Sequence, residues 1–269
     1  MISFEKEYFN LGFTDKLAYM DGFMQSLDPR VKIITTAAFT IMVVSYSKYE
    51  LTGLMAFFLF PVLCCNLGNV PVMYVLKKLL CFSIFPLIIG MFNPLIDTNP
   101  QIFFMNTGIS GGWISLVSIV FKFQLTFSAA IILIATTPLP QICIGLKRLG
   151  VPEIFTSQLL FLYRYIFVLS EEAMKMARAR GLRTFGKVNM SIRDFTNLSG
   201  LLFIKTYERA ERIYQAMLSR GFSGTVRSIK DISFKPADLF YLLVTTTLLL
   251  LFRAYNLADI LGKAIIGGL

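Results

Sequence analysis

Apolar residues gather in five long runs along this chain, at about 31–47, 51–67, 79–96, 113–135 and 236–252. A helix rises about 1.5 Å per residue, so a run of about 17–25 apolar residues crosses the hydrocarbon core of a bilayer. The runs therefore predict five transmembrane helices. The expected fold class is an all-α, polytopic membrane protein.

The residues before the first run, 1–30, mix aromatic and charged side chains, which is typical of a segment lying at the membrane surface. This segment closes with Leu27-Asp28-Pro29-Arg30. Aspartate can cap a helix and proline is tolerated in the first turn, so this string predicts the start of the first helix.

Between the fourth and fifth runs the pattern changes to that of amphipathic helices. Apolar positions alternate in steps of three and four along two stretches, which predicts one helix from Pro152 to Arg180 and a second from about Asp194 to Arg220. The first stripe is Phe155, Leu159, Leu162, Ile166, Leu169, Ala173, Met176 and Arg180, and the second is Ser199, Phe203, Thr206, Ala210, Ile213, Met217 and Arg220. The chain then divides into a segment at 1–30, four spans in 31–135, an amphipathic module in 136–235, and the last span with a tail in 236–269.

Composition agrees with a membrane protein, because charged residues make up 16% of the chain and the mean hydropathy is +0.66. Soluble domains carry about 25% charged residues. The net charge is +10, and 16 of the 26 Lys and Arg residues lie in 138–235 with only seven acids. Cytoplasmic segments carry the Lys/Arg excess, so this module is expected in the cytoplasm.

Counting spans back from the module tests this topology. The loop 97–112 should lie outside and has no Lys or Arg, whereas the loop 68–78 should lie inside and contains Lys77 and Lys78. The N-terminus should also be cytoplasmic, and Arg30 and Lys32 stand before the first span. The expected topology is thus a protein that crosses the membrane several times, with the N-terminus and the module on the cytoplasmic side.

The stretch 154–169 is mostly apolar and is a possible sixth span. It contains Arg164, and an arginine at the bilayer centre costs about 2.5–3.5 kcal/mol on insertion scales. A span here would also move the basic module outside. We therefore expect a helix lying at the inner surface.

The two amphipathic helices end in matching strings, Ala179-Arg180-Gly181 before Leu182 and Ser219-Arg220-Gly221 before Phe222. Arg-Gly at a helix end can be simple capping, since glycine favours the left-handed conformation there and arginine suits the macrodipole. Two such ends, however, favour docking of each guanidinium on a partner's carboxylates through paired hydrogen bonds. Met176, Leu182, Met217 and Phe222 would then supply apolar contacts.

The sequence lacks the residues that catalysis, ATP binding and metal binding usually require. It has no histidine, no Walker A string and no cysteine spacing typical of a metal site. We therefore expect no catalytic residue, no metal site and no cofactor in this chain, and nothing in it indicates nucleic-acid binding. Lys122 is the one charge in mid-span up to residue 135, and is expected either inside the bundle or, by preference, reaching toward an interface.

The chain resembles the transmembrane T component (EcfT) of energy-coupling factor transporters, and its cobalt branch, CbiQ. The resemblance rests on Leu27-Asp28-Pro29-Arg30, on Leu146-Lys147-Arg148-Leu149-Gly150-Val151-Pro152 and on the two X-Arg-Gly ends, and the run Glu208 to Phe222 is similar to CbiQ.

The resemblance implies a coupling subunit in the lipid bilayer, between two cytoplasmic ATP-binding cassette subunits, which bind the ATP, and a membrane substrate-binding S component. That component is expected to be CbiM-like, alone or with a small CbiN-like subunit. The resemblance also implies that Arg180 and Arg220 are the docking residues of two coupling helices, with Ala179, Gly181, Ser219 and Gly221 as their flanks, and that cobalt(II) is the substrate.

Two other readings compete with a coupling subunit. A stand-alone carrier of a soft metal or small solute would use Cys64, Cys65 and Cys81 with Met42, Met55 and Met91. Such residues in apolar spans are more often packing residues than ligands. A membrane-bound enzyme or assembly factor has no catalytic residues to support it.

Overall fold

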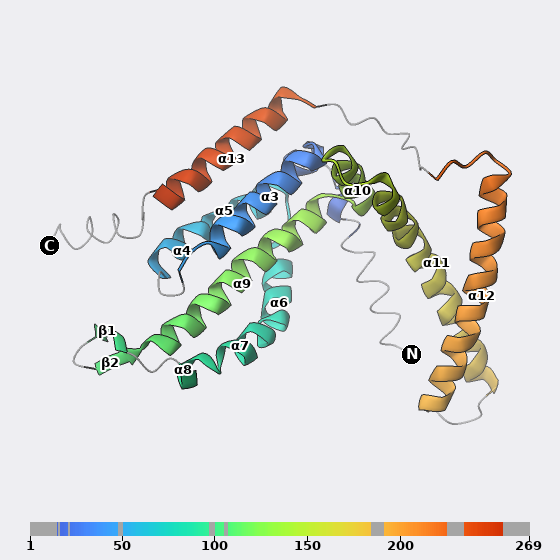
Figure 1. Ribbon diagram of the computed structural model, residues 1–269, viewed down its shortest axis with the longest axis horizontal. Coiled ribbons are helices and arrows are strands. Elements are labelled where there is room, and N and C mark those ends of the chain that lie inside the picture. The colour runs from blue at the N-terminus through green and yellow to red at the C-terminus, as the bar shows by residue number, and fades with distance from the viewer. Residues whose placement is uncertain are drawn as a thin grey trace. The chain divides into compact units, whose positions relative to one another are not determined.

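The computed structural model describes residues 15, 17–20, 22–47, 51–96, 100–104, 107–183, 191–224 and 234–254. The chain forms two compact units (Figure 1). We call Thr14–Pro138 with Ile232–Leu269 the membrane unit, and Leu139–Asp231 the helix-pair unit. The chain thus leaves the membrane unit once, builds the helix-pair unit, and returns to form its last helix.

The membrane unit is built around one long central helix, α9 (Gly111–Thr136). Helices α3 to α8 all contact it, and α13 (Pro236–Ala254) packs on α3 and α4. The surrounding helices are α2 (Phe23–Ser26), α3 (Pro29–Val44), α4 (Leu51–Phe57), α5 (Leu59–Leu67), α6 (Val72–Phe82), α7 (Ile84–Gly90) and α8 (Asn93–Ile96). A membrane protein of packed helices, the predicted fold class, is confirmed.

Three helices are long and apolar enough to cross a membrane among the described residues: Val72–Leu95, Gly111–Thr136 and Pro236–Ala254. The helices at the first two predicted spans are shorter than these three. Helix α3, at the first, has 16 residues, and the apolar helix at the second is Gly53–Leu67. Asp28 caps α3 as predicted, because its carboxylate accepts from the Arg30 amide and Pro29 opens the helix.

The predicted start of the third span at residue 79 is wrong, because helix α6 already begins at Val72. Lys77 and Lys78 lie inside this helix and not in the preceding loop. Their long aliphatic stems allow this, and the Lys78 ammonium sits 4.7 Å from the centre of the Tyr74 ring.

The predicted loop 97–112 contains a small hairpin that the sequence pattern did not reveal. Strands β1 (Pro100–Phe104) and β2 (Thr107–Ser110) pair antiparallel, with Ile102 opposite Ile109 and Phe104 opposite Thr107. This hairpin is the one departure from helix among the regular elements that the structure describes.

Aromatic side chains fill the interior of the membrane unit. The Phe39 and Phe60 rings stack with centroids 4.4 Å apart, and Phe57 lies edge-on to Tyr46 and Phe252. Large apolar side chains of α6 and α7, such as Leu80, Phe85 and Ile88, instead point outward and are exposed. An apolar core inside an apolar outer face is what a bilayer solvent requires.

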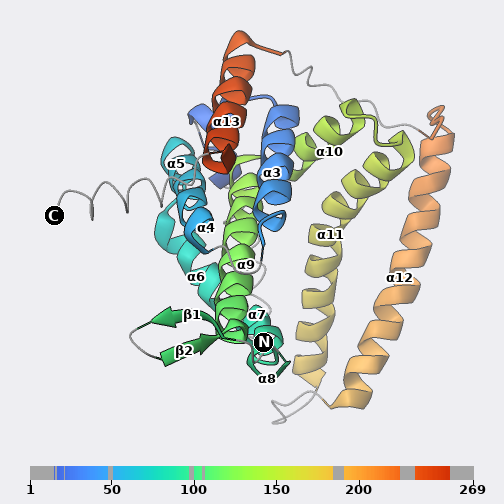
Figure 2. The same cartoon turned by 60° about the vertical axis from the view of Figure 1, so that its left-hand side comes forward.

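The helix-pair unit contains α10 (Leu139–Arg148), α11 (Glu153–Arg183) and α12 (Ile192–Leu218). Gly150 ends α10 in the left-handed conformation at φ 98°, where the amide of Val151 donates to the carbonyl of Leu146. Helix α10 packs on α11, and α11 and α12 run antiparallel, side by side (Figures 1 and 2).

Candidate functional site

Arg180 lies near the end of α11 and is held by an acid on the next helix. Its Nη2 donates to Oδ2 of Asp194, which stands in the first turn of α12. The same oxygen accepts from the Ser191 amide at 3.2 Å, so Asp194 also orders the start of α12. The Arg180 side chain is 23% exposed. This end of the helix pair is therefore closed by an ion pair that presents the guanidinium in a fixed position.

The prediction that α11 stops at Gly181 is wrong, because the helix continues through Gly181 and Leu182 to Arg183. Glycine permits the left-handed conformation but does not require it, and Gly181 is helical here. An added Cβ at Gly181 would meet no atom within 4 Å. Arg180 thus lies within the last turns of the helix and does not cap it.

Arg220 stands at a helix end of the predicted kind. Gly221 is left-handed at φ 76°, its amide donates to the Leu218 carbonyl, and the Phe222 amide donates to the Met217 carbonyl. These two bonds form a Schellman motif, which satisfies the last carbonyls of α12. The Arg220 side chain is exposed, and no hydrogen bond or ion pair of this side chain is found within the described part of the chain.

Helices α11 and α12 run antiparallel (Figure 2), so Arg180, in the last turn of α11, and Arg220, just after the end of α12, lie at opposite ends of the pair. Arg180 is paired with Asp194 at the start of α12, and Arg220 follows the end of the same helix, 26 residues later. At about 1.5 Å per residue the two positions are about 39 Å apart. One helix pair therefore carries two separate arginine-bearing ends.

An apolar groove of about 710 Å³ runs between α11 and α12. The predicted stripe of α12 is confirmed as one face from Phe203 to Met217, because Phe203, Thr206, Ala210, Ile213 and Met217 all line the groove; its end members Ser199 and Arg220 do not.

The first half of the predicted α11 stripe lies outside the groove, and Phe155, Leu159 and Leu162 line a second hollow on α11. Helix α11 turns a neighbouring face to the groove with Ile154, Gln158, Phe161 and Tyr165, and the predicted stripe reaches the groove only at Leu169. Phe155 and Leu162 of the predicted stripe are instead 64% and 63% exposed. Since 154–169 is apolar on nearly every side, spacing alone could not choose the face. Helix α11 is not among the described helices that could cross a membrane.

The four predicted apolar contact residues have different surroundings. Met217 and Phe222 line the groove, and the Phe222 ring packs edge-on against Phe161 with centroids 6.4 Å apart. Leu182 is 83% exposed beside Arg180. Met176 is buried, so its side chain is not available at the surface. The docking flanks Ala179, Gly181, Ser219 and Gly221 are all exposed.

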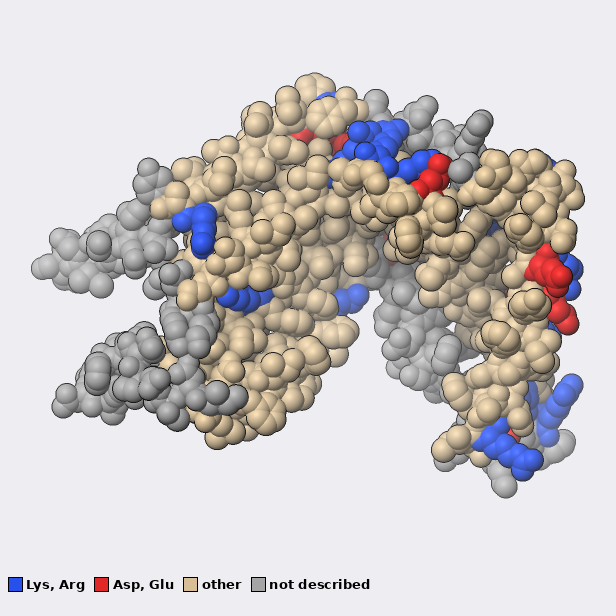
Figure 3. Space-filling view, viewed as in Figure 1, with Lys and Arg blue, Asp and Glu red and all other residues tan. Residues whose placement is uncertain are grey.

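Charged side chains mark the solvent side of this unit. Lys and Arg side chains gather where α11 ends and α12 begins (Figure 3). The pair Glu171–Lys175, with N–O 2.8 Å, follows the i,i+4 spacing. Between the helices, Lys205 Nζ donates to Glu172 Oε1 at 2.9 Å, and this hydrogen bond lowers the pKa of Glu172.

Asp194 and Glu172 were missed as partners by sequence reasoning. The start of α12 near Asp194 was predicted, and Ser191 three residues before it fits a capping box, but nothing local indicated that Asp194 also pairs with Arg180. The cross-helix pairing of Glu172 with Lys205, 33 residues away, has no such local signal.

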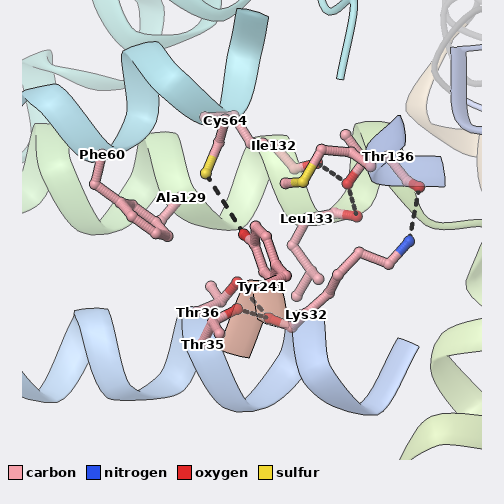
Figure 4. Close-up of a pocket in the computed structure, with 11 residues that line it drawn as sticks. Lys32, Thr35, Thr36, Phe60, Cys64, Ala129, Ile132, Leu133, Thr136 and Tyr241 are labelled. Carbon is pink, nitrogen blue, oxygen red and sulfur yellow. Dashed lines mark hydrogen bonds between the residues drawn. The ribbon is translucent and has the colours of Figure 1, made fainter. Parts of the chain in front are cut away.

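The membrane unit offers little to a soft-metal carrier. Cys64 and Cys65 are buried, Cys81 is exposed, and Met55 and Met91 point outward with 55% and 71% exposure. The cavity beside Cys64 holds only about 10 Å³ (Figure 4), and the Cys64 sulfur lies 3.8 Å from the Tyr241 hydroxyl. No group of three or more His, Cys, Asp or Glu able to hold a metal occurs among the described residues.

Lys122 contacts the end of another helix, which agrees with the expectation that it lies inside the bundle. Its ammonium donates to the Tyr46 carbonyl at 2.5 Å and lies 3.5 Å from the Val44 carbonyl, at the end of α3. A cation is favourable at the negative end of a helix. The preferred expectation, a side chain reaching toward an interface, did not consider these carbonyls.

Comparison with known proteins identifies the family. The family model CbiQ, cobalt transport protein, matches residues 21–232. An uncharacterized protein of Methanocaldococcus jannaschii is 32% identical over 89% of this chain and 86% of its own length. The energy-coupling factor transporter transmembrane protein EcfT of Ruminiclostridium cellulolyticum is 27% identical over 76% of this chain and 81% of its own.

The cobalt transport protein CbiQ of Salmonella typhimurium is 30% identical over 44% of this chain and 56% of its own length. The family model covers well over half of the chain, including both arginine-bearing ends. The chain therefore belongs to the CbiQ cobalt transport proteins, the transmembrane T components of energy-coupling factor transporters.

Proposed function

We propose that this chain transmits ATP-driven motion of two cytoplasmic ATPase subunits to a membrane substrate-binding subunit. The observation that carries the proposal is the pair of arginine-bearing ends on one antiparallel helix pair. An arginine presented at an ordered helix end can bind a carboxylate through two parallel hydrogen bonds. Two ends about 39 Å apart suit two partner subunits, one at Arg180 and one at Arg220.

Two ion pairs join the helices and would let the pair carry motion between its ends. Helices α11 and α12 flank an apolar groove and are joined across it by an ion pair between Lys205 and Glu172 and by a second between Arg180 and Asp194. Movement of the ATPase bound at one end is then passed to the other end and to whatever occupies the groove.

The apolar groove fits the membrane substrate-binding subunit. Its lining is mostly aliphatic and aromatic, and a helix of a membrane protein can lay an apolar face in such a groove. The ATPases in turn take the charged ends. This division gives each class of partner the surface whose chemistry it matches.

The positive charge of the module supports a cytoplasmic orientation for the helix-pair unit and the N-terminus. ATP is bound and hydrolysed by the partner subunits, and this chain is non-catalytic. Cobalt(II) is the proposed substrate, because CbiQ of Salmonella typhimurium is a cobalt transport protein. The substrate itself is recognised by the S component.

Reconstitution tests this function. The chain is purified with two ATPases and a substrate-binding subunit, placed in proteoliposomes, and assayed for ATP-dependent uptake of cobalt(II) against nickel(II). We expect uptake that needs all subunits. Arg180→Glu/Arg220→Glu should stay in the membrane and lose the ATPases. Full uptake by that variant would contradict the proposal, and uptake by the chain alone would favour a stand-alone carrier.

A further inference from the structure

We propose that Asp28, Lys32 and Asp238, with the carbonyl of Thr136, form a clamp that fastens both chain connections to the helix-pair unit. The clamp would transmit force from those connections into the membrane helices during transport. The inference rests on the proposed coupling function and assigns positioning residues to it.

The first connection leaves the membrane unit at the end of α9. Lys32, on the first turns of α3, is 2% exposed and its ammonium donates to the Thr136 carbonyl at 3.2 Å (Figure 4). Thr136 is the last residue of α9, and the helix-pair unit starts three residues later at Leu139. Lys32 therefore holds the point at which the chain departs.

The second connection returns at the start of α13. Asp238 is 1% exposed, and its two carboxylate oxygens accept from two different helix starts. Oδ2 accepts from the Lys235 amide at 2.7 Å, just before α13, and Oδ1 accepts from the Asp28 amide at 2.8 Å, the N-cap of α3. One carboxylate thus ties the returning chain to α3, the helix that also holds the departing chain.

The charges of the clamp match the three helix ends that meet there. Carboxylates stand at the starts of α3 and α13, and an ammonium stands at the end of α9, as the helix dipoles favour. The Lys32 ammonium interacts electrostatically with the carboxylates of Asp238 and Asp28. Buried charges in a membrane protein are expensive and mark functional positions more often than plain packing ones.

Polar atoms beside the clamp are left without hydrogen bonds. Oδ2 of Asp28, Nε of Arg30 and Oγ1 of Thr137 are buried without a hydrogen-bond partner within the described part of the chain, although Arg30 Nε lies 3.7 Å from Asp28 Oδ1 as an ion pair. A partly satisfied buried network is poorly suited to a merely stabilising role, because an apolar core would be more stable. The network lies at both connections, and a role in transmitting force would explain why it is polar. This role would also include the Asp28-Pro29-Arg30 string.

The test uses the full complex of this chain with two ATPases and a substrate-binding subunit in proteoliposomes. Lys32→Met keeps the length of the side chain and removes its charge. We expect ATP hydrolysis near the wild-type rate and a fall of about tenfold in substrate moved per ATP. The double variant Lys32→Met/Asp238→Asn removes both charges and should recover part of the substrate moved per ATP that Lys32→Met loses. Lys32→Arg, which keeps the positive charge, should keep most of it.

Lys122→Met is the matched control, because Lys122 also donates to carbonyls at an end of α3 but away from the connections. It should leave substrate per ATP unchanged. An unchanged ratio in Lys32→Met would overturn the clamp while the coupling function stands. The clamp would also be overturned if neither Lys32→Met nor the double variant reached the membrane, because the cluster would then serve folding. Failure of the wild-type complex to assemble would instead refute the coupling function and the clamp with it.

Discussion

The ends at Arg180 and Arg220 have nearly the same sequence and different structures. At Arg180 the helix continues past the glycine, and the guanidinium is paired with Asp194. At Arg220 the helix ends in a Schellman motif on a left-handed glycine, and the side chain is exposed. A short string of matching residues therefore does not fix a matching conformation.

The difference indicates two ways of presenting an arginine to a partner. Arg180 is ordered before binding, so it loses less side-chain entropy on docking but must share or leave Asp194. Arg220 meets no such competing carboxylate among the residues that the structure describes, and its order comes from the helix end that carries it. If both ends dock, a partner's carboxylate at Arg180 has to compete with an internal one, and the two ends will respond differently to substitution.

The largest effect is expected from charge reversal at either end. Arg220→Glu should weaken ATPase association by about 2–5 kcal/mol, because it removes one charge pair and leaves the partner's carboxylate facing another. Pull-down of the ATPases with the purified chain measures this. Arg212→Glu, on the exposed side of α12, is the control and should have a small effect. Equal loss in both variants would mean that general charge, and not the helix end, binds the partner.

A swapped ion pair sharpens the comparison at the other end. Arg180→Glu/Asp194→Arg keeps a salt bridge between α11 and α12 with its charges exchanged. We expect a folded protein whose ATPase association is as weak as that of Arg180→Glu, since the docking charge is gone. Recovery of association in the same pull-down would show that Arg180 serves only to join the two helices.

The two glycines should respond with opposite signs. Gly221→Ala forces a Cβ into the left-handed conformation and should destabilise the protein by about 1–2 kcal/mol. Gly181→Ala fills open space inside a helix and should stabilise it by about 0.5–1 kcal/mol. Thermal unfolding in detergent, followed by circular dichroism, measures both. The same sign at both positions would contradict the difference between the two ends.

The smallest effect is expected midway between the two ends, at Lys205 and Glu172. The hydrogen bond from Lys205 lowers the pKa of Glu172, so the pair stabilises the protein above the ordinary carboxyl pKa. That contribution is lost as the pH falls through the lowered pKa. Lys205→Met should flatten the acid side of the melting-temperature profile slightly. An unchanged profile would mean that solvent screens this exposed pair completely.

Features that depend on residues close together in the sequence were predictable. Apolar runs located the long helices α9 and α13, spacing identified the groove face of α12, and Asp28 with Pro29 marked the start of α3. Each of these depends on neighbours within a few turns.

Features decided by tertiary contacts were not predictable. Gly181 tolerates a helix as readily as an end, so its neighbours decide, and the apolar first half of α11 offers more than one face. The bond from the Asp28 amide to Asp238 joins residues 210 positions apart. A single sequence contains no local signal for such a pair.

Photo-crosslinking in the assembled transporter tests the central claim most directly. A photoreactive benzophenone residue replaces Ala179 or Ser219, the exposed neighbours of the two arginines, and Glu208 on the exposed side of α12 as the control. We predict crosslinks to an ATPase subunit from positions 179 and 219, and none from position 208. Crosslinks from neither 179 nor 219 to an ATPase, in a complex that hydrolyses ATP and takes up substrate, would contradict the account.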